Sequence, residues 1–145
     1  RPAVEIGSRD GHPWSHTIRG PDGGGVYATL NIKGNEAAFT AGTYQNAFTW
    51  EGEVFHDIID PRTGYPAAGT ASVTVLHPNA STADAAATAL FVAGPSAWHR
   101  LARQLGVRYG MLTETEGRVH MNPAMQQRIK LQNTDREIII SKPLS

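Results

Sequence analysis

Apolar and polar residues alternate at a period of two along several short stretches of the chain, a pattern typical of β-strands with one buried face. The segment 71–76 shows it most clearly, because two valines alternate there with Ser72 and Thr74. We expect a half-buried strand at that position. Further strands are predicted at 4–6, 16–18, 54–59, 107–112 and 118–121, with a turn at 116–117 between the last two.

A β-hairpin is predicted in the first third of the chain. Residues 26–32 (VYATLNI) alternate partly between apolar and polar, and a second run at 36–40 follows after Lys33, Gly34 and Asn35. A glycine next to an asparagine favours a tight turn, and the spacing fits a hairpin connection. We therefore expect the two runs to pair with each other.

Two helices are predicted near the middle of the chain. Ser81, followed by Asp84 three residues later, matches a capping pattern at the start of an alanine-rich stretch, and Gly94 stands at the expected end. The second helix, 96–105, carries three large apolar residues on one stripe and stops at Gly106. These residues are Trp98, Leu101 and Leu105.

The order of these elements predicts an α+β fold, with a mostly antiparallel sheet and a helical pair packed on it. Strands cluster before and after the helices, whereas a doubly wound fold would alternate strands with helices. We assign residues 1–131 to one domain. Residues 132–145 are expected to form a C-terminal tail or an edge strand, because the β-branched run Ile138–Ile140 fits either.

The composition narrows the possible functions. At 145 residues the chain has the length of one ordinary domain. Its 13 basic and 13 acidic residues leave no net charge, which argues against a nucleic-acid partner. There is no cysteine, so any metal must be held by oxygen or imidazole. The longest apolar run, 83–93, is shorter than the ~18 residues that span a bilayer, so we expect no transmembrane helix.

Asp84 and Thr88 are the strongest candidates for chemistry. Residues four apart on a helix lie on the same face one turn apart, so the carboxylate and the hydroxyl can reach one object. Two hard oxygen ligands favour a hard cation, and Mg²⁺ suits them because it takes one or two carboxylates and shares its shell with waters and phosphates. The alternative is structural: Asp84 completes a capping box and Thr88 bonds back to a helix carbonyl.

A second candidate is the segment 60–64 (DPRTG), which directly follows the predicted strand 54–59. Arg62 offers a planar guanidinium and Thr63 a hydroxyl, and both groups can grip phosphate or ribose. An ordinary turn is the alternative, since Asp before Pro with a following Gly is typical turn chemistry.

His12 and His16 have the i, i+4 spacing of a metal-binding pair. Gly11 and Pro13 prevent a helix there, so we expect these histidines in a surface loop and not as ligands. Motifs of other enzyme classes do not occur: the sequence contains no G-x-S-x-G, no Walker A and no G-x-G-x-x-G.

Taken together, these segments resemble the C-terminal half of the ApbE family, the FAD:protein FMN transferases. The resemblance runs from about residue 1 to residue 129, and its most specific blocks are IIDPRTG and ADAxxT in that order. The matching motifs, in chain order, are DGxPW at 10–14, TAGxY at 40–44, IIDPRTGYP at 58–66, SVTV at 72–75 and ADAxATALFVxG at 83–94.

The resemblance implies a Mg²⁺-dependent enzyme that transfers FMN from FAD to a Ser or Thr hydroxyl of an acceptor protein and releases AMP. Asp84 and Thr88 fall on the family's metal ligands. FAD and the flavin-acceptor protein are the implied partners, and a periplasmic or other bacterial cell-envelope location is implied as well. The residues implied to bind the flavin nucleotide are Thr40, Gly42, Tyr44, Asp57, Asp60, Arg62, Thr63 and Gly64.

Two positions depart from the family pattern. Asp57 stands where the family has a histidine implicated in catalysis, and His56 lies one residue earlier. Neighbouring side chains of a strand point to opposite faces, so His56 could replace that histidine only with a bulge, and Asp57 is the candidate catalytic residue. Ala41 replaces a serine near the nucleotide. These changes leave a second hypothesis open: a non-catalytic module that binds FAD or a maturation partner.

Length is a third departure. Members of the family are about twice as long, and the resemblance assigns a backbone metal ligand, a lysine and much of the FAD pocket to their N-terminal half. We therefore expect residues 1–131 to be the C-terminal portion of a larger, two-lobed transferase, with the N-terminal half of the same protein as a further partner.

Overall fold

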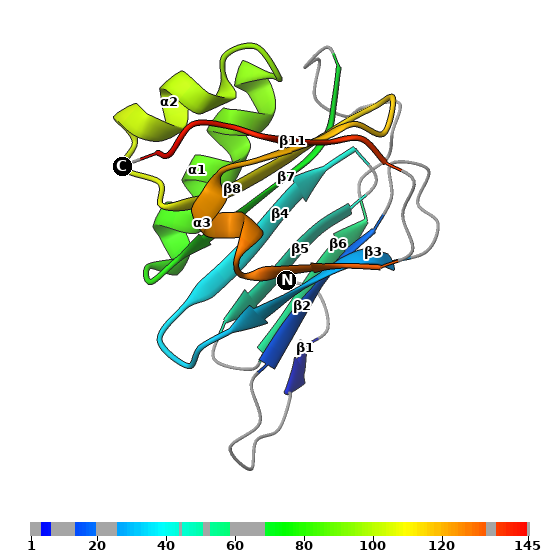
Figure 1. Cartoon of the computed structure of the whole chain (residues 1–145). Helices are drawn as coiled ribbons and strands as arrows, with labels where there is room; N and C mark the ends of the chain where they lie inside the picture. Colours follow the sequence, from blue (N-terminus) through cyan, green and yellow to red (C-terminus); the bar gives the residue numbers. More distant parts are fainter. Residues whose placement is uncertain are drawn as a thin grey trace.

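The strands form two separate sheets (Figure 1). The computed structural model describes residues 4–6, 14–19, 26–43, 45–50, 53–58, 69–132 and 136–144. In order across it, the large sheet contains β1 (Val4–Ile6), β6 (Glu53–Ile58), β5 (Gln45–Trp50), β4 (Ala37–Gly42), β7 (Thr70–His77), β8 (Tyr109–Glu114), β9 (Val119–Met121) and β11 (Ile138–Ile140). The small sheet contains β10 (Ile129–Leu131), β3 (Val26–Ile32) and β2 (Trp14–Arg19).

The predicted fold class is confirmed. Every pairing between described strands is antiparallel except that of β11 with β9, and the helices are few. They are α1 (Ala80–Ala93), α2 (Trp98–Gln104) and the single turn α3 (Pro123–Gln126). Strands before and after a helical pair therefore build an α+β domain, as the element order indicated.

The large sheet is the middle layer of three. α1 packs on one of its faces, where Val73 of β7 joins a buried cluster with Leu90 and Phe91. The small sheet packs on the other face, where Leu30 of β3 is buried together with Leu76 of β7. Because successive side chains of a strand point to opposite faces, β7 contributes to both clusters. Figure 1 shows α1 and α2 on one side of the large sheet and β2 and β3 on the other.

The hairpin predicted at 26–40 was wrong. Both strands exist, but β3 pairs with β2 and β10, whereas β4 pairs with β5 and β7. The turn between them, in which the Glu36 N–H donates to the Lys33 carbonyl at 3.0 Å, carries the chain from one sheet to the other. A period-two pattern shows that one face of a strand is buried, and it does not specify the partner strand. Strands β5 and β10 were not predicted.

β7 is buried on both faces, so the prediction of a half-buried strand was wrong. Val73, Thr74, Val75 and Leu76 are all buried. The alternation of apolar and polar residues is real, but the polar side has a polar partner instead of solvent: the hydroxyl of Thr74 hydrogen-bonds to that of Thr40 at 2.8 Å. A buried hydroxyl is tolerated where such a partner exists.

Helix α1 begins earlier than predicted. Asn79 is the N-cap, because its side-chain oxygen accepts a hydrogen bond from the Thr82 N–H at 2.9 Å. Ser81 therefore lies inside the first turn and does not cap the helix. Gly94 ends the helix as predicted, with φ of 83° and its N–H donating to the Leu90 carbonyl.

Helix α2 is shorter than predicted, and its apolar stripe is incomplete. Trp98 is buried, but Leu105 lies just beyond the helix and is 44% exposed. The chain turns at Gly106, whose φ of 74° favours glycine. No helix in the described ranges is long and apolar enough to cross a membrane.

The C-terminal segment is part of the packed structure. Ile138–Ile140 forms β11, which pairs with β9 at the edge of the large sheet. Beyond it, the carbonyl of Lys142 accepts a hydrogen bond from His99 Nε2 of α2 at 2.8 Å. Leu144 is 6% exposed and belongs to the cluster that α1 buries. This segment thus connects the edge of the sheet to the helical layer.

Candidate functional site

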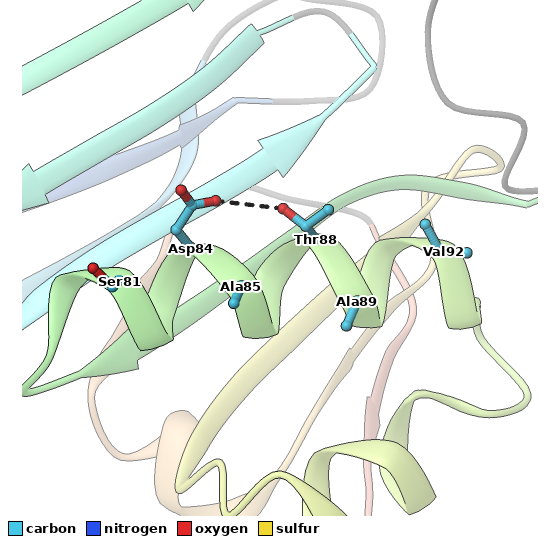
Figure 2. A pocket seen from close by; sticks show the side chains of 6 residues that line it. All are labelled: Ser81, Asp84, Ala85, Thr88, Ala89 and Val92. Atoms are coloured by element: carbon cyan, nitrogen blue, oxygen red, sulfur yellow. Dashed lines mark hydrogen bonds between the residues drawn. The ribbon is translucent and has the colours of Figure 1, made fainter.

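Asp84 and Thr88 lie on the solvent-facing side of α1. Figure 2 shows their side chains rising from the same side of the helix, and the Thr88 hydroxyl donates a hydrogen bond to Asp84 Oδ1 at 3.5 Å. The predicted i, i+4 geometry is therefore present. Because α1 begins at Ala80, Asp84 lies in the second turn and is not the first-turn acid of a capping box.

An open depression surrounds this pair. Its volume is about 710 Å³, and it is lined by Ser81, Asp84, Ala85, Thr88, Ala89 and Val92 (Figure 2). The other side of the helix consists largely of alanines, among them Ala83 and Ala87, which are fully buried and let the helix axis approach the sheet. The small residues of α1 therefore have two effects. On the buried side they allow close packing against the sheet, and on the open side they leave space next to the two oxygen donors.

The donor set fits a hard divalent cation. A carboxylate and a hydroxyl within hydrogen-bond distance of each other are both oxygen donors, which Mg²⁺ prefers, and the carboxylate supplies the negative charge. In the described ranges, no three or more Asp, Glu or His side chains cluster as a metal site. The pair would supply part of a coordination shell, which is usual for Mg²⁺ because it retains waters and takes substrate phosphates.

Thr40 and Gly42 lie on β4, and Thr40 faces away from α1. The Thr40 hydroxyl is hydrogen-bonded to His16 Nε2 at 2.7 Å and to the Thr74 hydroxyl at 2.8 Å. His16 belongs to β2, so this side chain points towards the small sheet, and the large sheet separates it from Asp84. Gly42 is the last residue of β4 and is buried.

Asp57 lies on β6, where it pairs with Asn46 of β5. The register between these strands runs without a shift from Gln45 opposite Ile58 to Trp50 opposite Glu53. No bulge therefore moves His56 into the position of residue 57. The other predicted nucleotide-binding residues lie outside the described ranges: Tyr44, Asp60, Arg62, Thr63 and Gly64.

The expectation that His16 lies in a surface loop was wrong. It is 2% exposed, within β2, and its Nδ1 is 2.8 Å from the hydroxyl of Thr49 on β5. The strand predicted at 16–18 was the better guide: His16 and Ile18 are buried while Ser15 and Thr17 are exposed, which is the period-two pattern of a strand. His12 lies outside the described residues.

Two charged pairs lie away from this site. Burial raises the pKa of Glu36, but hydrogen bonds from Arg128 and from the Lys33 N–H outweigh it, so its pKa lies below the ordinary value. The pKa of Glu114 is also lowered, chiefly by its hydrogen bond with His120 and further by the charge of Arg118. The pair of Glu36 and Arg128 joins segments that are distant in the sequence. Glu114 contacts residues on the other side of the turn at 116–117. These contacts stabilise the fold and take no part in the depression on α1.

Solved structures share this arrangement of sheets and helices. The ApbE protein of Thermotoga maritima matches with a TM-score of 0.61 and 32% identity, over 84% of this chain and 40% of that one. The apo form of the flavinyl transferase ApbE from Pseudomonas stutzeri matches with a TM-score of 0.56 and 28% identity, over 86% of this chain and 39% of that one. The fold is that of the ApbE flavin transferases.

Relatives identified by sequence similarity support the same family. An FAD:protein FMN transferase of Rhodobacter capsulatus is 40% identical over 125 residues, which is 86% of this chain and 24% of the relative. Another from Escherichia coli K12 is 35% identical over 108 residues, 72% of this chain and 30% of the relative. The family model described as the ApbE family matches residues 3–111, and this chain belongs to that family. It spans about a quarter to a third of the length of these curated relatives.

Proposed function

We propose that this chain is part of an FAD:protein FMN transferase that moves FMN from FAD to a Ser or Thr hydroxyl of an acceptor protein and releases AMP. Membership of the ApbE family and the names of its relatives support the reaction class. The observation that carries the proposal for this chain is the Asp84–Thr88 pair, whose two oxygens share one open side of α1.

Asp84 and Thr88 would hold Mg²⁺ in this proposal. When bound, the ion would neutralise the diphosphate of FAD and favour departure of AMP. Asp84 provides the charge and Thr88 a neutral oxygen, and their mutual hydrogen bond would give way to the shared ion. The alanines beside them leave the space that waters and phosphates need.

The remaining residues would bind and orient the substrates. In the transfer, the hydroxyl oxygen of the acceptor bonds to the phosphorus of the FMN moiety, the bond from that phosphorus to the AMP phosphate breaks, and the hydroxyl loses its proton. Asp57 is the candidate acceptor of that proton, because a carboxylate can act as a general base. Arg62 and Thr63 are assigned to the phosphates, which a guanidinium fork binds through paired hydrogen bonds.

The test is a flavin-transfer assay on the full gene product that contains these residues. It is incubated with FAD, Mg²⁺ and a flavin-acceptor domain, and covalent fluorescent product is measured. We expect Asp84→Asn to abolish transfer while changing the unfolding free energy little, since the side chain is exposed. Ser81→Ala, on the same open side of α1, is the matched control and should retain activity. Full activity of Asp84→Asn would refute the metal assignment.

A second candidate function is a non-catalytic FAD-binding or maturation-partner module. The unshifted register of β5 and β6 favours it, because Asp57 and not His56 occupies the position next to Ile58. If the parent protein binds FAD without turnover and Asp57→His introduces transfer, this second function is correct. An active parent protein would exclude it.

The cell-envelope location and the need for an N-terminal half are part of the same proposal. Fractionation of cells that express the full gene product tests the location. Mixing this chain with the N-terminal half of a relative such as the Thermotoga maritima ApbE protein tests the second point, because a shared site predicts FAD binding only by the mixture.

A further inference from the structure

The first residues of β7 have an irregular backbone. Gly69, just before the strand, has a φ of 86°, in the left-handed region that favours glycine. From Thr70 to Ser72 the strand advances two residues, whereas its partner β8 advances only one. The extra residue on β7 is a β-bulge, and bulges are common next to binding and active sites, where they change the direction of a side chain.

A buried hydroxyl at this place lacks a hydrogen-bond partner. Thr70 is 1% exposed, and its Oγ1 has no partner among the residues that the structure describes. Thr49 and Thr74 are buried as well, but the hydroxyl of each has a side-chain partner at 2.8 Å. An unpaired buried hydroxyl costs free energy, whereas an apolar group of the same shape does not. Valine would therefore give a more stable fold at position 70 than threonine.

Thr70 lies at the edge of the large sheet where two strands of the implied FAD site end. β4 ends there, and the N–H of Thr43, directly after it, donates to the Ala71 carbonyl at 3.0 Å. β6 ends at the same edge with Ile58, because it pairs antiparallel with β5, which pairs antiparallel with β4. The residues assigned to the flavin nucleotide thus lie on β4 near this edge or, as in 60–64, follow β6 from it.

Helix α1 returns to the same edge. A Cβ built on Gly69 would lie 3.8 Å from the ring of Pro95, which directly follows the C-cap of α1. Thr88, the proposed hydroxyl ligand of Mg²⁺, belongs to the half of α1 that ends there. The start of β7 is therefore adjacent to the elements that carry the proposed nucleotide and metal residues.

We propose that Thr70 is a binding residue of the FAD site, and that its hydroxyl donates a hydrogen bond to an oxygen of bound FAD. The inference rests on the proposed function and adds a residue of β7 to that site. A threonine hydroxyl has one hydrogen to donate, and the diphosphate and ring carbonyls of FAD are acceptors. Because the hydroxyl is covered, FAD reaches it only with a local shift of the backbone, for which Gly69 and the bulge on either side of Thr70 provide the freedom.

Three substitutions separate this role from a purely structural one. Thr70→Val removes the hydroxyl and keeps the side-chain shape, so without FAD it should unfold at a higher urea concentration than the parent. Thr70→Ser keeps the hydroxyl and loses one buried methyl group, so it should unfold at a lower one. Thr49→Val is the matched control, because the Thr49 hydroxyl has a partner in His16 and the residue lies near the opposite end of β5. This control should also unfold at a lower urea concentration.

The experiment measures FAD affinity by flavin fluorescence in the full gene product that contains these residues, and urea unfolding of the same proteins without FAD. We expect Thr70→Val to bind FAD about tenfold more weakly than the parent, a loss of ~1.4 kcal/mol that is typical of one hydrogen bond. Thr70→Ser and Thr49→Val should bind FAD within about twofold of the parent. The stability and the FAD affinity of Thr70→Val thus change in opposite directions.

An FAD affinity of Thr70→Val within about twofold of the parent would overturn the inference. Lower stability of Thr70→Val without FAD would overturn it too, because the hydroxyl would then have its partner within the protein itself. An equal loss of affinity in Thr70→Ser would show that side-chain shape and not the hydroxyl matters, which also contradicts the proposal. A parent protein that binds no FAD would instead overturn the proposed function, and the inference with it, so the two failures are distinguishable.

Discussion

Replacing Leu144 with alanine tests whether the C-terminal segment supports the helical layer. Leu144 is 6% exposed, and its cluster includes Leu90 and Phe91 of α1 and Trp98 of α2. Large-to-small substitutions of buried leucines cost ~2–5 kcal/mol, depending on how far the site can collapse. Leu144 keeps a small part of its surface exposed, so we expect a loss in the lower part of this range, about 2–3 kcal/mol.

The matched control is Leu105→Ala. This leucine is 44% exposed just after α2, so the same chemical change removes little buried surface and should cost about 0.5 kcal/mol or less. Lys142→Ala is a second control within the segment itself, because it leaves intact the backbone carbonyl that accepts the hydrogen bond from His99. It should have an effect as small as that of Leu105→Ala.

The assay is urea unfolding followed by intrinsic tryptophan fluorescence, with thermal unfolding alongside. At about 2–4 °C per kcal/mol for a chain of this size, Leu144→Ala should lower the melting temperature by about 5–10 °C. Equal effects of Leu144→Ala and Leu105→Ala would show that the C-terminal segment is not packed as described. The reasoning from burial to stability would then be refuted for this part of the fold.

Three further predictions concern other parts of the molecule. Mg²⁺ at 100 times the dissociation constant of the parent protein should raise the free energy of unfolding by ~2.7 kcal/mol. At the same Mg²⁺ concentration, Thr88→Val should gain less, and an equal gain would contradict the role of Thr88. Since the pKa of Glu36 is lower in the folded state than its ordinary value of 4.5, its contribution to stability is present above that value and lost as the pH falls through the folded pKa. Glu36→Gln should therefore flatten the acid limb of a plot of unfolding free energy against pH, and an unchanged slope would contradict this. Gly117→Ala should destabilise by about 1 kcal/mol or more, because φ is 101° and the new Cβ would lie 2.9 Å from Arg136 Nη1; chemical denaturation checks it, and a neutral result would contradict the turn geometry.

Features set within a single element were predictable from the sequence. The i, i+4 spacing of Asp84 and Thr88 placed both side chains on one side of a helix before any tertiary contact was known, because the helical repeat alone determines it. The end of α1 at Gly94 and the turn at Gly117 followed in the same way from backbone preferences. Most strand positions were equally local, since the side-chain period of two belongs to the extended chain itself, although β5 and β10 were not predicted.

Only the tertiary structure decided which strands pair and which side chains of different elements contact one another. The pattern at 26–40 showed two strands with buried faces, but their pairing in different sheets depends on which surfaces the whole domain covers. Thr74 looked like a solvent-facing residue until the small sheet buried it beside Thr40. His16 could not be recognised as a buried residue linking the sheets, because its hydroxyl partners are 24 and 33 residues away in the sequence. The sequence determined this protein's local geometry, and burial by distant segments determined which of its polar groups face one another.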